Sequence, residues 1–182
     1  MDGRILNIVD EAGNTVGQAT REEIHQKGLL HGEVHVWFYT PDGKIIFQHR
    51  AKDKDTYPDL LDATVGGHVE VGDTYEQTAL KESEEETGVT LNPADLTFLA
   101  TTITTSFDEV TGKTNHPRRN VYAYRYAGDV ADLKVEEGKA IGFEAWPIDT
   151  LLNLPAADAS RFIPNILEKE GQDIIAKIQK LM

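Results

Sequence analysis

The stretch from Gly66 to Val89, GGHVEVGDTYEQTALKESEEETGV, decides the fold of this chain. It opens with two glycines and continues with residues that favour a helix. Asp73 is a suitable N-cap, and Glu76, three residues later, completes a capping-box pattern. Gly88 stands where a glycine commonly ends a helix. The stretch therefore predicts a glycine-rich loop followed by a helix over residues 74–87.

Three glutamates of this helix, Glu82, Glu85 and Glu86, stand at positions i, i+3 and i+4 and share one face. Each like-charge pair costs roughly 0.2–0.5 kcal/mol, and each carboxylate near the helix C-terminus costs a further ~0.3–1 kcal/mol. A bound divalent cation offsets these costs, and carboxylate oxygens are ligands that Mg²⁺ and Mn²⁺ prefer. A solvated acidic face is the alternative, but the glycines on both sides of the helix favour a metal site.

The same stretch, residues 66–89, resembles the Nudix box, in which glycines, acids and one basic residue recur at fixed spacing. The matching positions are Gly67, Asp73, Lys81, Glu82, Glu85, Glu86 and Gly88. Asp73, Lys81 and Ser83 depart from the pattern, because the family usually has Glu, Arg and an aliphatic residue there. The resemblance implies an α/β fold, the Nudix-type α/β/α sandwich with a mixed β-sheet. It also implies a Mg²⁺ (or Mn²⁺) site formed by Glu82, Glu85 and Glu86 together with Gly66, through its carbonyl.

Length and composition indicate one domain, residues 1–182, which is large enough to bury a core. The net charge of −13 argues against nucleic acid or an anionic membrane as a partner. The chain has no cysteine, which excludes disulfides and thiol nucleophiles. No apolar run reaches the length of a membrane span, and the N-terminus lacks a signal-peptide pattern. We therefore expect a cytoplasmic monomer or homodimer that acts on a small molecule.

The remaining segments predict strands on both sides of the box and helices at the C-terminus. Residues 1–30 predict an N-terminal extension made of a β-hairpin and a short helix. Residues 33–40 predict a strand that is covered on both faces. Residues 106–118 predict a long polar loop, a kind of segment that is usually functional or mobile. Residues 164–182 predict a helix with apolar side chains at helical spacing and with Gly171 as its weak point.

The N-terminal half also resembles the Nudix branch that contains isopentenyl-diphosphate isomerases. The resemblance rests on Val16–Arg21, His25, His31, Gln48–Lys54 and Tyr57–Asp62. His25, His31 and His68 are similar to the isomerase metal site, although isolated histidines more often cap or pack a helix. The isomerases place a catalytic cysteine where this chain has Gly66. Because a glycine cannot supply a proton to an alkene carbon, the sequence favours a hydrolase over an isomerase.

The predicted reaction is the metal-dependent hydrolysis of a diphosphate linkage in a nucleoside diphosphate linked to another moiety. Metal held by the catalytic residues Glu82, Glu85 and Glu86 would neutralise developing charge and activate a water. Phosphate-binding candidates from loops are Arg50, Lys52, His116, Arg118 and Arg119. An acid from a later loop often assists such enzymes, and Glu109, Glu136, Glu137 and Glu144 all remain open. The off-pattern box residues leave a second alternative, a sensor module that binds a metal–nucleotide complex without turnover.

Overall fold

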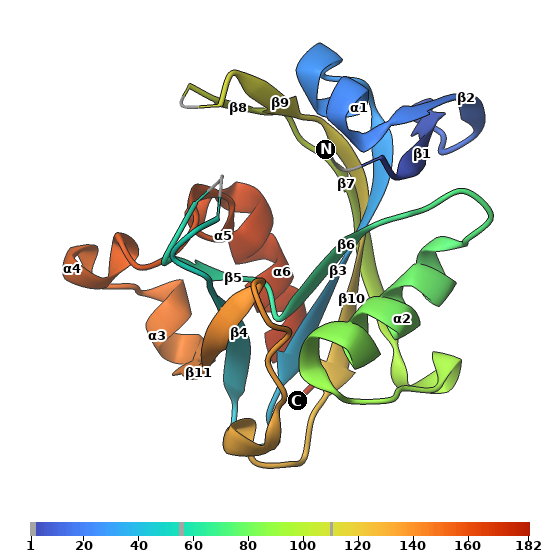
Figure 1. Cartoon of the computed structure of the whole chain (residues 1–182). Helices are drawn as coiled ribbons and strands as arrows, with labels where there is room; N and C mark the ends of the chain where they lie inside the picture. The colour runs from blue at the N-terminus through green and yellow to red at the C-terminus, as the bar shows by residue number, and fades with distance from the viewer. Residues whose placement is uncertain (1–2, 55–56, 110) are drawn as a thin grey trace.

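The protein is described by a computed structural model covering residues 3–54, 57–109 and 111–182 (Figure 1). The strands are β1 (Ile5–Val9), β2 (Thr15–Thr20), β3 (His31–Tyr39), β4 (Lys44–Arg50), β5 (Leu61–Asp62), β6 (Val65–His68), β7 (Thr97–Ile103), β8 (Ser106–Asp108), β9 (Lys113–Asn115), β10 (Pro117–Arg125) and β11 (Ala140–Pro147). The helices are α1 (Arg21–Lys27), α2 (Tyr75–Thr87), α3 (Ile148–Leu152), α4 (Ala156–Ala159), α5 (Pro164–Leu167) and α6 (Lys169–Gln179), with 3₁₀ turns η1 (Pro93–Asp95) and η2 (Val130–Asp132). No helix within these ranges is long and apolar enough to cross a membrane.

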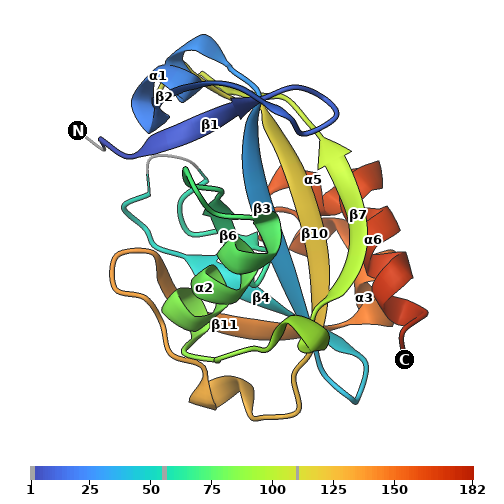
Figure 2. The ribbon, with the colours of Figure 1, turned by 90° about the vertical axis from the view of Figure 1, so that its right-hand side faces the viewer.

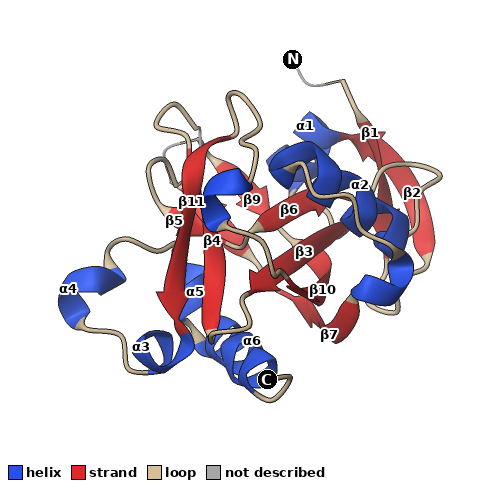
Figure 3. Cartoon of the chain, turned by 90° about the horizontal axis from the view of Figure 1, so that it is seen from below, coloured by secondary structure: helices blue, strands red, loops and turns tan. Residues whose placement is uncertain are grey.

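Strand β3 is the centre of a mixed sheet that is formed by nine of these strands. It pairs antiparallel with β1, β4 and β6 and parallel with β10, which in turn pairs with β7. Strands β11 and β5 extend the sheet beyond β4, and β2 extends it beyond β1. Seen from below in Figure 3, β4 and β11 run across the direction of β3 and β10, so the sheet curls. The predicted mixed α/β fold is confirmed.

Alternation along β3 explains why helices cover both faces of the sheet. Val34, Val36 and Phe38 pack into a core cluster with Ala79 of α2. Trp37 lies on the opposite face of β3 and packs into a separate core cluster with residues of α3 and α6. Figures 1 and 2 show α2 and α6 on opposite sides of β3. This confirms the predicted strand with two covered faces and gives the expected α/β/α layers.

The N-terminal extension forms as predicted. Strands β1 and β2 pair antiparallel, and Ile24 of α1 is buried with Leu6 and Ala19 in a small cluster of their own. The Thr20 side chain caps α1 by accepting a hydrogen bond from the Glu23 backbone N–H at 3.2 Å. The hairpin contributes strand pairing to β3, so the extension is continuous with the main sheet.

The box helix α2 begins one residue later than its sequence predicts. Thr74, not Asp73, is the N-cap, and its Oγ1 accepts from the Gln77 backbone N–H at 3.1 Å. The Gln77 side chain accepts in return from the Thr74 N–H at 2.9 Å, which completes the capping box in place of Glu76. The Asp73 N–H is used by the preceding turn, where it donates to the Glu70 carbonyl at 3.2 Å. The turn therefore ends at Asp73 and leaves Thr74 to cap the helix.

Three other segments also differ from the sequence prediction. Gly66 and Gly67 lie within strand β6 rather than in a loop, because they pair with β3. The predicted loop at 106–118 contains the β8–β9 hairpin and the start of β10. The C-terminal segment breaks at Glu168, whose extended backbone separates α5 from α6.

Gly171 lies inside α6 and is not its weak point. A Cβ there would lie 2.5 Å from the Asn165 carbonyl oxygen, so the glycine permits the close approach of α5 and α6.

Replacing Thr74 with alanine removes the side-chain acceptor of the α2 cap. We predict a loss of about 1 kcal/mol in the free energy of unfolding, the usual cost of deleting such a cap. Urea denaturation of Thr74→Ala measures it. The matched control is Asp73→Ala, which should cost less, because no helix N–H bonds to that side chain. A larger loss for the control would contradict the assignment of the cap.

Candidate functional site

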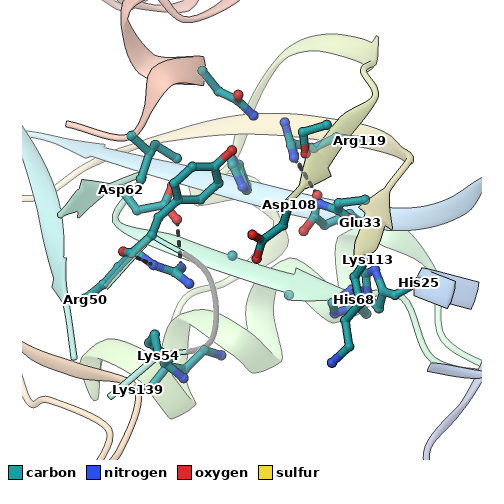
Figure 4. Close-up of a pocket in the computed structure, with 18 of the residues that line it drawn as sticks. His25, Glu33, Arg50, Lys54, Asp62, His68, Asp108, Lys113, Arg119 and Lys139 are labelled. Carbon is teal, nitrogen blue, oxygen red and sulfur yellow. Dashed lines mark hydrogen bonds and ion pairs between the residues drawn. The ribbon is translucent and has the colours of Figure 1, made fainter. Parts of the chain in front are cut away.

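A cavity of about 280 Å³ opens where β6 and β4, which both pair with β3, diverge from each other. Its walls come from α1, β3, the end of β4 with the segment after it, β6, α2, the β8–β9 hairpin, β10 and α5. Figure 4 shows charged side chains from these distant parts of the sequence pointing into one space. Some of the residues that meet there, among them Glu82, Arg50 and Arg119, are candidates for chemistry from the sequence.

Two glutamates of α2 are buried at this cavity. Glu82 is 8% exposed and Glu86 is fully buried. Glu86 Oε2 accepts from the Gln48 amide at 2.8 Å and from the Gly66 N–H at 3.4 Å. The Lys139 ammonium forms ion pairs with Glu86 Oε1 and, at 3.3 Å, with Glu82 Oε2. The two carboxylates therefore converge on a single cation.

One ammonium cannot balance two buried carboxylates. Burial, together with the neighbouring Glu82, raises the pKa of Glu86 to about 7 against the opposing effects of Lys139 and Gln48. Burial also raises the pKa of Glu82. Burial alone would lower the pKa of Lys139, but Glu86 and Glu82 raise it above its ordinary value. The pair of carboxylates thus favours a divalent cation, which supplies the second positive charge.

The glycine at position 67 makes room for this arrangement. A Cβ on Gly67 would lie 2.5 Å from Glu82 Oε1. The Glu82 carboxyl therefore rests directly on the backbone of β6, which only a glycine allows. Glu86 Oε1 is buried, and its ion pair among the described residues is with the Lys139 ammonium. Carboxylate oxygens placed in this way are ligands of the kind that Mg²⁺ and Mn²⁺ prefer.

Comparison with known proteins agrees with this geometry. The model of the NUDIX domain matches residues 29–166. The chain belongs to the Nudix superfamily. An uncharacterised Nudix hydrolase of Streptomyces coelicolor is 38% identical over 139 residues, which cover 76% of this chain and 73% of the relative. Another from Clostridium acetobutylicum is 27% identical over 92% of this chain and 78% of its own length. The protein is thus a Nudix pyrophosphohydrolase.

Solved structures share the fold at low sequence identity. Deinococcus radiodurans DR0079 has a TM-score of 0.69 and 20% identity, over 95% of this chain and 98% of that one. The NUDIX domain of Shewanella oneidensis NrtR, determined with ADP-ribose, has a TM-score of 0.59 and 16% identity, over 90% of this chain and 99% of that one. Both structures share the fold of this chain. Because the two matches cover 95% and 90% of the chain, the likeness includes the N-terminal extension as well as the box.

The predicted site residues of the Nudix box do not all reach the cavity. Glu82, Gly66 and Gly67 line it, and Glu86 lies directly behind them, bonded to Gly66. Glu85 is exposed on α2. Lys81 pairs with Glu70 at 3.5 Å and is itself exposed.

Two of the five predicted phosphate-binding residues line the cavity, namely Arg50 and Arg119. Arg50 donates to Asp62 at 3.0 Å, and Arg119 donates to Glu33 at 2.6 and 2.9 Å (Figure 4). The Arg119 guanidinium holds the pKa of Glu33 well below its usual range, despite the opposing effect of burial.

The other three candidates are not among the cavity-lining residues. Lys52 is exposed and lies 3.9 Å from Asp59. Arg118 donates to the backbone carbonyls of Glu11 and Ala12 and stacks on Tyr75, so it ties the N-terminal hairpin to the body of the protein. His116, named with them, contacts the Gly28 carbonyl at 3.1 Å.

None of the four acids proposed as a distal acid lines the cavity. Glu109 and Glu137 are exposed, Glu136 pairs with Lys139 at 3.6 Å, and Glu144 pairs with Arg161 at 2.7 Å. Among the described residues that follow the box, the acid that lines the cavity is Asp108, at the end of β8 (Figure 4). The turn residue Gly112, with a φ of 67°, was the signal that could have revealed the hairpin presenting Asp108.

Three histidines form a second group of potential ligands beside the cavity. Each of His25, His31 and His68 offers one ring nitrogen, and these three nitrogens all lie within 4.8 Å of one another. Nδ1 of His31 lies 2.9 Å from the Leu29 carbonyl and Nδ1 of His25 lies 3.4 Å from the Thr114 carbonyl. Because a carbonyl oxygen can only accept a hydrogen bond, Nδ1 of each of these rings carries the proton. Nε2 of each ring therefore has a lone pair that faces the histidine cluster. A histidine that binds a metal through one ring nitrogen usually donates a hydrogen bond from the other to a carbonyl or carboxylate oxygen.

The His25 and His68 Nε2 atoms approach to 3.2 Å, and His31 Nε2 is buried without a hydrogen-bond partner among the described residues. Burial lowers the pKa of all three rings, that of His25 to about 4. Neutral imidazoles with converging lone pairs are suitable ligands for a transition metal.

Proposed function

We propose that this Nudix hydrolase cleaves a diphosphate linkage in a nucleoside diphosphate linked to another moiety, with a divalent cation held by the box glutamates. The convergence of the Glu82 and Glu86 carboxylates on one cation carries the proposal. The Shewanella domain, which shares the fold, was determined with ADP-ribose, a member of that substrate class. The small exposed fraction of both carboxylates favours tight, water-excluding binding of the cation.

Each residue of the site has its own role in the proposed reaction. Glu82 and Glu86 bind Mg²⁺ or Mn²⁺, with the Gly66 carbonyl and Glu85 as further ligands. Gln48 and the Gly66 N–H orient the Glu86 carboxylate. A cation held by these residues would supply positive charge against the charge that develops on the phosphates and would lower the pKa of a water nucleophile.

Asp108 and Glu82 are the carboxylates of the cavity lining that can accept the proton of the attacking water. Arg50 and Arg119, fixed by Asp62 and Glu33, bind phosphate oxygens on either side. Gly66 offers no acid for the protonation of an alkene, and a Cβ there would already lie 3.2 Å from the His35 ring, so the isomerase alternative is not favoured.

The carboxylates are tested by amide substitution. Glu82→Gln and Glu86→Gln should each lower Mg²⁺-dependent kcat/KM by more than about 100-fold, beyond the usual effect of supporting contacts around a metal. The assay is the release of nucleoside monophosphate from nucleotide sugars, dinucleotides, ADP-ribose and nucleoside triphosphates. Glu84→Gln is the matched control, because Glu84 is exposed on the same helix and bonds only to Thr90 among the described side chains. Full activity in EDTA or in either variant would refute the metal assignment.

We also propose that His25, His31 and His68 bind a transition metal separately from the glutamates. Titration with Co²⁺, followed by its visible absorption, should give one imidazole-bound ion per chain. His25→Gln should remove the signal, and Glu86→Gln should retain it. His49→Gln is the control, since His49 pairs at the surface with Asp59 and Glu144. An unchanged spectrum in His25→Gln would show that the cluster is only packed.

A further inference from the structure

Lys139 touches the same oxygens that the proposed function assigns to a divalent cation. Its ammonium forms one ion pair with Glu86 Oε1 and a second, at 3.3 Å, with Glu82 Oε2. The other oxygen of Glu86 already accepts hydrogen bonds from the Gln48 amide at 2.8 Å and from the Gly66 N–H at 3.4 Å. Oε1 is therefore the Glu86 oxygen that a cation would contact. Because two cations on one buried oxygen repel each other strongly, the ammonium has to leave as the cation binds.

A third carboxylate gives the Lys139 ammonium a second partner. Glu136 Oε2 lies 3.6 Å from this ammonium, three residues earlier in the chain. The oxygen is buried and has no hydrogen-bond partner among the described residues. The Glu136 side chain as a whole is 42% exposed, whereas that of Glu86 is 1% exposed. The ammonium thus stands between a buried pair of carboxylates and a third one that reaches the surface.

The Lys139 side chain can change partners while its backbone stays in place. Its carbonyl accepts a hydrogen bond from the Ala51 N–H at 3.2 Å, and its N–H donates to the Glu136 carbonyl at 3.1 Å. These bonds fix the Lys139 backbone beside both positions. Lysine carries its charge at the end of a flexible four-carbon stem. Because this side chain is 29% exposed, it has space for a different rotamer.

We propose that Lys139 and the divalent cation exchange on Glu82 and Glu86: the ammonium turns toward Glu136 as the cation binds and returns as it leaves. This inference rests on the proposed function and adds a means by which its metal site is regulated. Since binding has to break an ion pair, Lys139 lowers the affinity of the site for metal. The exchange also favours divalent ions, because a monovalent ion would only replace one unit charge with another.

The affinity for Mg²⁺ tests this competition, because Mg²⁺ prefers oxygen ligands to imidazole. The full chain is titrated by calorimetry at mildly alkaline pH, where protons compete least for Glu86. Lys139→Met should bind Mg²⁺ at least about tenfold more tightly than the parent, the factor that one charge-assisted contact is worth. Lys134→Met is the matched control and should bind as the parent does. Lys134 is exposed in the segment that leads to β11, and its loss changes the net charge equally.

Glu136→Gln tests the second partner and should act in the opposite direction. Without this carboxylate the ammonium stays on Glu86, so the affinity for Mg²⁺ should fall by about two- to fivefold, the range for a partly exposed ion pair. Glu137→Gln is the control, because Glu137 is exposed beside it and carries the same charge. This comparison also holds if Lys139→Met fails to fold. Equal affinities of the two glutamine variants would overturn the assignment of Glu136.

The movement itself is followed by NMR of the lysine Nζ atoms, recorded through the Cε hydrogens, which do not exchange with water. The signal that Lys139→Met lacks belongs to Lys139. Saturating Mg²⁺ should shift this signal and leave that of Lys134 in place. An unchanged Lys139 signal, or equal affinities of the parent and Lys139→Met, would overturn the proposal and leave the metal assignment standing. No binding of Mg²⁺ by the parent or by any variant would refute the metal assignment itself, and with it the exchange.

Discussion

The burial of two carboxylates on adjacent turns of one helix is the constraint on which this structure depends. Glu82 and Glu86 lie against β6, where an ordinary side chain at position 67 would collide with the Glu82 carboxyl. Removing two such charges from water is costly unless positive charge is close by. Lys139, brought in by the pairing of β11 with β4, supplies part of it. The box, the glycine strand and the segment before β11 thus form one electrostatic unit.

The central strand β3 organises the rest of the site. Its odd-numbered residues His31, Glu33 and His35 share one face, and the register with β10 and β6 sets Glu33 opposite both Arg119 and His68. One strand thereby joins the histidine cluster, the buried ion pair and the glycine strand. Trp37, the next residue on this face of β3, is buried in the core cluster that α6 covers. The polar residues of this face therefore end at the edge of the cavity.

Sequence patterns predicted the parts of this site whose residues lie close together along the chain. The spacing of the box predicted the helix, and β3 was recognisable from its apolar alternation. The cap was assigned to Asp73 because both it and Thr74 are good N-cap residues, and only the turn that uses the Asp73 N–H decides between them. Asp108 was missed because its short hairpin strands carry few β-branched or apolar residues.

Long-range charge pairing could not be predicted from the sequence either. Nothing near Lys139 in the chain indicates that strand pairing between β4 and β11 delivers it to Glu86. Arg118 and Arg119 are neighbours with the same charge, yet strand alternation points one toward the N-terminal hairpin and the other into the cavity. Such distinctions depend on register, which is a property of the folded sheet.

The most direct test of this account is to locate the cation by anomalous diffraction from crystals soaked in Mn²⁺. The account predicts an anomalous peak between the carboxylates of Glu82 and Glu86, next to Gly66, with the Lys139 ammonium displaced from Glu86. A peak at the exposed face of α2 alone, with the ion pair of Lys139 and Glu86 intact, would contradict the claim that these two buried carboxylates exist to bind a divalent metal.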